Sequence, residues 1–323
     1  MSYSQPPLGR KSSAPWNRLR PVKQDPLEVM GYVSKGDNRL LDSKAQESFY
    51  DKIVARYMQF CSQHSKDLDS AFASLSIAPN NDHNDRKALL PGESRPLTPS
   101  PPKDANHWGA SPPQELQLIL TALRKLREGI LGSSSTRSSP VLAQRVHVFN
   151  IRVAILAHHW ESYLPSLIYL LSRLHSQEFP LPKSELFEMT SYLILDLGTR
   201  QNNLGAAFAL RHNSRVRFGY ENRRVDAILH AVVTNNWIVF WRTRRIVDGY
   251  LRAMLHWHAE TIRKPVLKAI GRTYMATDLQ WILSSTTGSD GSDMSWEELV
   301  QAEDVGWARD GDKVIIRKPK VRP

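Results

Sequence analysis

The amino-acid sequence predicts an all-α chain, in which a TPR-like solenoid of paired helices leads into a C-terminal winged helix with a small β-hairpin. Between residues 113 and 258, apolar residues recur at helical spacing on more than one face, as expected for helices stacked between neighbours. Near the C-terminus, Ser295 and Glu298 have the spacing of a capping box that opens a short helix. Asp310-Gly311 then precedes an apolar run, which predicts a tight hairpin because glycine adopts positive φ without strain.

Composition divides the chain into six segments. Proline, serine and basic residues crowd the N-terminus without a sustained helical period, so we expect a disordered arm there. A second stretch rich in proline and serine interrupts the helical pattern, and proline fixes φ and removes a backbone donor. We therefore assign residues 1–42 to a disordered basic arm, 43–76 to an N-terminal helical segment, 77–112 to a linker, 113–258 to the helical stack, 259–318 to the winged helix and 319–323 to a basic tail.

Start and stop signals place the first helices. Ser43 with Gln46 predicts a capped start, and Glu115–Ile130 is a helix that should end at Gly132. Ser139-Pro140 is a favourable N-cap and first-turn pair for the next helix. That helix should break at His158-His159-Trp160. The apolar stripe of the first helix comprises Phe49, Ile53, Tyr57 and Phe60.

The later helices follow at short intervals. A strongly apolar segment is followed by Pro180-Leu-Pro182, which should close a loop, and Ser184 should cap the helix behind it. The remaining helices are expected at Tyr163–Leu174, Leu204–Leu210, Val225–Val233, Trp237–His258 and Pro265–Tyr274.

Positive charge is concentrated in three places. The chain has a formal net charge of +11, with excess basic residues in segments 1–24, 211–245 and 312–323. Clusters of this kind favour nucleic acid or an acidic protein as a partner, although a solvated basic surface is the alternative. The candidate nucleic-acid-binding residues are Arg242, Arg244, Arg245, Lys313, Arg317 and Lys318.

Three segments carry a resemblance to a known family. They are Glu260-Thr-Ile-Arg263, Lys268-Ala-Ile-Gly-Arg-Thr-Tyr274 and Leu279-Gln-Trp-Ile-Leu283. They resemble the entry to the winged helix in PCI-domain proteins, in the branch of small subunits shared by the proteasome lid, the COP-nine signalosome and translation initiation factor three. A neighbouring branch, the Sac-type subunits of mRNA-export complexes, has the same layout.

The resemblance covers roughly Pro113–Lys318 and implies a function. It implies a non-catalytic scaffold subunit whose partners are other PCI-type subunits, bound through the helical stack and the winged helix. The alternative is an RNA- or DNA-binding adaptor in mRNA processing or export that uses the basic 211–245 face and the wing. We expect Trp296, Trp307, Val314 and Ile316 to form the small core of the winged helix and to support partner binding there.

The sequence contains no recognisable catalytic or metal-binding motif. His256 and His258 are two residues apart, so a helix points them to different faces, and no cysteine pair or HExxH motif accompanies them. Cys61 has His64 three residues on but no glycine motif for an oxyanion, so a structural thiol is expected. We therefore predict no enzyme activity, no cofactor and no metal.

Two further features remain as hypotheses. Trp237 and Trp241 flank the arginine cluster and suit either base stacking or a core, whereas Trp257 favours a core. Thr98 and Ser100 each precede proline, so they are candidate sites for proline-directed kinases.

The expected compartment is the cytoplasm, the nucleus or both. A single cysteine suits a reducing compartment, and neither a secretory leader nor an apolar run of membrane-spanning length is present in the sequence. We expect no association with membranes.

Overall fold

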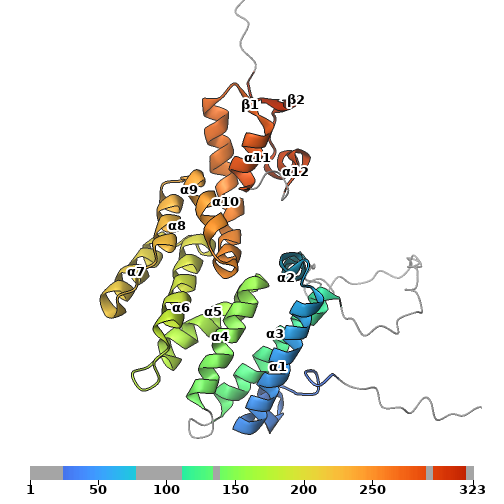
Figure 1. Ribbon diagram of the computed structural model, residues 1–323, viewed down its shortest axis with the longest axis vertical. Helices are drawn as coiled ribbons and strands as arrows, with labels where there is room; N and C mark the ends of the chain where they lie inside the picture. The colour runs from blue at the N-terminus through green and yellow to red at the C-terminus, as the bar shows by residue number, and fades with distance from the viewer. Residues whose placement is uncertain (1–24, 78–110, 134–138, 289–293, 318–323) are drawn as a thin grey trace, which may run out of the picture.

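The computed structural model describes residues 25–77, 111–133, 139–288 and 294–317. Within these residues the protein is mostly helical, with twelve α-helices and a small three-stranded antiparallel sheet. The helices follow one another across the molecule, and the sheet lies at the end remote from α1 and α3 (Figure 1). The predicted helical class with a small C-terminal sheet is therefore confirmed in these coarse terms.

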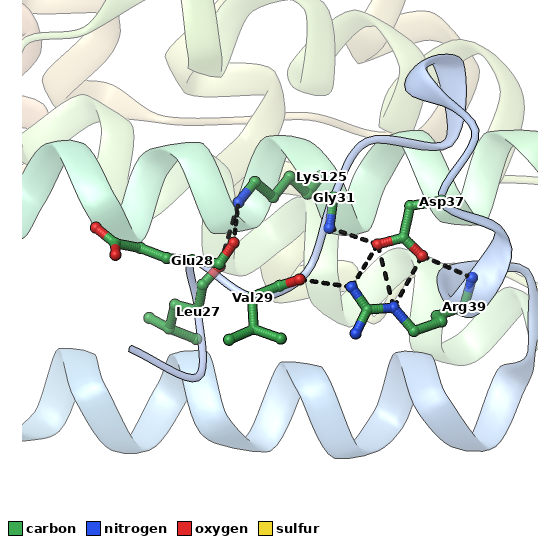
Figure 2. A network of polar contacts seen from close by, with 7 residues as sticks. All are labelled: Leu27, Glu28, Val29, Gly31, Asp37, Arg39 and Lys125. Carbon is green, nitrogen blue, oxygen red and sulfur yellow. Dashed lines mark hydrogen bonds and ion pairs between the residues drawn. The ribbon is translucent and has the colours of Figure 1, made fainter. Parts of the chain in front are cut away.

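The N-terminal region differs from the predicted disordered arm, because residues 25–42 pack against α3. Leu27 and Leu40 are buried, and the Lys125 ammonium group donates to the carbonyl oxygen of Leu27 at 3.2 Å. The Asp37 carboxylate accepts from the Gly31 N–H at 2.6 Å and from the Arg39 guanidinium, which also donates to the Val29 carbonyl, so this segment forms a closed loop (Figure 2). The segment contains two short 3₁₀ turns, Val33–Lys35 and Asn38–Leu41. They are too short to show a helical period in the sequence, so the segment was predicted to be disordered.

The helices begin and end largely at the predicted signals. Ser139 caps α4 through its side chain, and α3 ends at Gly132, as expected. Asp42, one residue before the predicted start, caps α1, while the Gln46 amide donates instead to the Leu40 carbonyl. The helices are α1 Ser43–Gln63, α2 Leu68–Ile77, α3 Pro112–Gly132, α4 Pro140–Leu156, α5 Trp160–Tyr169, α6 Lys183–Leu195, α7 Leu204–Phe218, α8 Arg223–Val233 and α9 Trp237–Ile246.

Several expected boundaries were wrong. Ser184 lies inside α6 and does not cap it, because the N-cap is Pro182. The predicted helix Leu204–Leu210 extends to Phe218, where Gly219 adopts a left-handed conformation. The predicted helix Trp237–His258 is two helices, because Val247 is extended and the Asp248 carboxylate caps α10 (Gly249–Thr273). That helix continues past residue 258 with Pro265 inside it, so the expected boundary between stack and C-terminal module falls within one helix.

The C-terminal module contains a strand that the sequence analysis missed. After α10 come β1 (Ala276–Asp278), α11 (Leu279–Thr287), α12 (Trp296–Glu303), β2 (Ala308–Asp310) and β3 (Lys313–Ile315). The sheet order is β1-β3-β2, with Thr277 and Arg309 on either side of Val314. Three residues are too few for a visible alternation, so the short β1 left no period-two pattern.

The predicted hairpin is confirmed, with its turn one residue later than expected. Asp310 ends β2, and Gly311 and Asp312 form the two-residue turn. Gly311 has φ +60°, which matches the glycine preference at the first central position of a type II′ turn.

Candidate interaction surfaces at the C-terminal module

The core of the C-terminal module is a small hydrophobic cluster. Trp296 and Val314 are buried in it, as predicted. Their side chains therefore hold α12 and β3 together. Because they are buried, a partner would contact the residues around them instead. The other buried members are Leu267, Leu279, Ile282, Leu283 and Leu299.

Trp307 packs against the small core, as predicted, and also against the main core, whereas Ile316 occupies a different place from that predicted. Trp307 precedes β2 and is half-buried, and its ring lies against α10, where a Cβ built on Gly271 would be 3.2 Å from Trp307 Cζ2. Ile316 follows β3 and packs against the main core, with its N–H bonded to the Met275 carbonyl at 2.8 Å. Val314 and Ile316 therefore do not share one small core, because the chain leaves the sheet between them.

Trp241 joins α9 to α11. Its side chain is 3% exposed, and its indole N–H donates to the Ser285 carbonyl oxygen at 2.8 Å. Gly288, at φ +76°, lies so close that an added Cβ would be 2.3 Å from Trp241 Cε3. Trp241 is therefore a core residue, and of the two tryptophans that flank the arginine cluster only half-buried Trp237 retains a partly exposed ring.

The three candidate arginines of α9 do not share one surface. Arg242 and Arg245 are exposed beside a cavity of about 210 Å³ that Trp237, Ser284 and Ser285 also line. Arg244 is half-buried and lines a different cavity with His158 and His256. Arg242 and Arg245 are three residues apart and therefore lie on one side of the helix. Arg244 is two residues from Arg242 and faces another side.

The predicted basic wing is also divided. Lys313 is exposed on β3, but the Arg317 guanidinium is bound to the carbonyl oxygen of Gly271 on α10. Lys318 lies outside the described residues, as do the candidate phosphorylation sites Thr98 and Ser100.

Helix α12 is acidic. Glu297 and Glu298 are exposed, and the segment Trp296–Asp304 contains no lysine or arginine. Ser295 and Glu298 form the predicted capping box, and the hydrogen bond from the Ser295 N–H lowers the pKa of Glu298. This face would repel a phosphate backbone and attract a basic surface.

Two edges of the sheet remain unpaired within the described residues, because β3 lies between β1 and β2. All three residues of β2 are exposed. In a two-residue hairpin the pair next to the turn, Asp310 and Lys313, is hydrogen-bonded, so the backbone groups of Arg309 point to the open side. Such an edge can accept a strand from another chain.

His158 and Cys61 are half-buried, and His256 lies exposed beside His158. The His158 and His256 rings lie 4.5 Å apart, and burial lowers the pKa of both. Burial also raises the pKa of the Cys61 thiol, which disfavours the reactive thiolate. Among the described residues, no group of three or more histidine, cysteine or acidic side chains is placed to hold a metal ion.

Comparison of the chain with protein-family models and with curated proteins finds no match in either. No helix of the described residues is long and apolar enough to cross a lipid bilayer.

Proposed function

We propose that this chain is a non-catalytic PCI-type scaffold subunit of a multi-subunit complex of the proteasome-lid, signalosome or initiation-factor type. The observation that carries the proposal is the C-terminal order α10-β1-α11-α12-β2-β3 with sheet order β1-β3-β2. A winged helix has this succession of helices and strands. A subunit of this kind would work in the cytoplasm or the nucleus.

The helices before the module support the same proposal. Sequence neighbours pack on one another, as in α3 on α4, α4 on α5, α6 on α7 and α8 on α9. Stacking of successive helical pairs is typical of a solenoid, which offers an extended lateral surface for assembly (Figure 1). We infer that other PCI-type subunits contact this stack and the C-terminal sheet.

The open edge of β2 is the docking element that we infer within the module. Its exposed backbone can pair with a strand of a neighbouring subunit, and main-chain hydrogen bonds would supply the affinity. The acidic α12 would favour a partner with basic residues beside its strand.

Proline at Arg309 tests this docking. Arg309→Pro removes the backbone N–H that points to the open edge and leaves the pairing with β3 intact, because Arg309 and Val314 are not a hydrogen-bonded pair. Affinity purification of the tagged full chain followed by mass spectrometry should return other PCI-type subunits, at least about tenfold depleted in the variant.

Arg309→Ala is the matched control, because it removes the same side chain and keeps the N–H. Its partner recovery should stay close to that of the parent chain. Recovery of the monomer alone at low salt, or equal recovery with alanine and proline, would contradict edge pairing.

A second candidate function is an RNA-binding adaptor. Exposed Arg242 and Arg245 beside Trp237 combine positive charge with a partly exposed aromatic ring, which suits single-stranded RNA. The prediction is binding that weakens steeply with salt and is lost on replacing the exposed Arg242 and Arg245 with glutamate. Filter binding of single-stranded RNA at low salt that gives no signal would exclude this function.

A further inference from the structure

A half-buried positive charge lies between α3, α4 and α5 without a carboxylate at ion-pair distance among the described residues. The Arg127 guanidinium is bound by neutral groups of α5, the Ser166 hydroxyl and, at 3.4 Å, the Ser162 carbonyl oxygen. In the part of the chain that the structure describes, no acidic side chain lies within ion-pair distance of it. Burial and the nearby Arg124 lower the pKa of Arg127 to about 10, so the group remains charged at neutral pH.

A charge held away from water without a charged partner costs free energy, and groups with strongly perturbed pKa values cluster at functional sites. The structure contrasts Arg127 with Arg56, Arg152 and Arg200, each of which forms an ion pair with a carboxylate. Arg127 therefore differs from these three arginines, because its guanidinium is bound by neutral groups instead of a carboxylate.

Arg127 lines an open cavity of about 370 Å³. Arg124 supplies a second guanidinium, while Leu131, Pro165 and Tyr169 give the cavity apolar walls. This volume lies in the range of small-molecule sites, and a few charged groups among apolar walls is their usual composition.

Glu128 and His147 also line the cavity, and each has contacts of its own. Glu128 accepts a hydrogen bond from the Ser34 N–H, and Ser34 together with Arg124 lowers the pKa of that carboxyl. His147 is 1% exposed and its ring lies 5.1 Å from that of Tyr169. Burial lowers the pKa of His147 to about 3, so the imidazole is neutral and adds no charge of its own.

The arginine is held in place by a polar network. The Asn150 amide donates to the Ser166 hydroxyl at 2.8 Å and to the Ser162 carbonyl at 2.9 Å, the same two groups that bind Arg127. The guanidinium is thus fixed before any ligand arrives, which reduces the entropy lost on binding.

We propose that this cavity binds a small organic molecule through a phosphate group held by Arg127 and Arg124. Two guanidinium groups match the charge of a phosphate monoester, and arginine is well suited to phosphate oxygens because its N–H groups form a planar fork. The apolar walls would contact the organic part of the ligand.

Calorimetric titration of the full chain with phenyl phosphate, in chloride buffer near neutral pH, tests the proposal. We expect saturable binding at one site, tighter than for inorganic phosphate because the ring adds apolar contacts, and weaker binding of acetate. Arg127→Met should reduce the affinity about tenfold or more, the loss expected for a charge-assisted contact. It should still fold, because methionine keeps the apolar part of the side chain and the Asn150 amide still binds Ser162 and Ser166.

Leu131→Glu gives a second test that leaves the interior intact, since this residue is exposed at the cavity. A negative charge there should weaken binding several-fold, whereas Met58→Glu, an equally exposed change on α1, should not. No saturable binding at millimolar phenyl phosphate, equal affinity for acetate, or undiminished binding in both cavity variants would overturn the proposal.

Discussion

The helical stack and the C-terminal module differ greatly in how much apolar surface each buries. Fifty buried hydrophobic residues form the main core of the described chain, whereas seven form the core of the module. A cluster of seven is too small to stabilise a free-standing domain. The module must therefore draw stability from the stack, through Leu267 of α10 and through Trp241, which reaches α11 from α9.

Replacing one buried leucine with alanine in each core should have the largest effect. The change in the main core should destabilise the whole chain, and the change in the small core only the C-terminal module. Leu123 and Leu299 are both 0% exposed, so replacing either with alanine should cost about 2–5 kcal/mol locally. Leu123→Ala should lower the urea midpoint of the whole chain. Leu299→Ala should increase hydrogen exchange in residues 276–317 and leave α3–α6 protected. Equal exchange in both regions for Leu299→Ala would show that the two cores unfold as one.

The link between the regions can be weakened at Gly288. Gly288→Ala places a Cβ against the Trp241 ring and also strains a positive φ, so we expect a loss of about 2–3 kcal/mol in the module. Gly219→Ala is the matched control, since Gly219 has φ +71° and open space around its Cα. It should cost only about 1 kcal/mol. Thermal unfolding that shows equal losses would mean that Trp241 moves aside and carries little of the link.

Lowering the pH should destabilise the helical stack before the C-terminal module. Folding lowers the pKa of His147 from 6.5 to about 3, so between these values the unfolded chain binds a proton that the folded chain does not. Stability is therefore lost as pH falls below 6.5, by about 2 kcal/mol between pH 7 and pH 5. His147→Phe should flatten this dependence in urea titrations. A pH profile unchanged by the substitution would mean that His147 does not control it.

The sequence predicted the elements with strong local signals. Ser139, Ser295 and Gly311 act at close range on their own backbone, so their roles could be inferred without knowledge of the fold. The helical class followed from periodicity over long segments. The order of the residues alone was thus enough for most helices and for the hairpin.

Features that depend on distant contacts could not be inferred. Residues 25–42 are ordered because Leu27 and Leu40 enter a core built from helices much later in the chain. The arginines of α9 form a continuous cluster in the sequence, but the helix directs Arg244 away from Arg242 and Arg245. The cavity at Arg127 left no signal, because an unpaired charge is recognised only when its surroundings are known.

Helix α10 fixes the angular relation of the two regions. It is one uninterrupted helix from Gly249 to Thr273, and it contributes Met254 to the main core and Leu267 to the small one. Each residue advances a helix by about 100° and 1.5 Å. Inserting a single residue between these two positions would therefore turn the sheet and its open edge by roughly a quarter of a circle about the helix axis. The length of α10 therefore sets the direction in which the open edge of β2 faces.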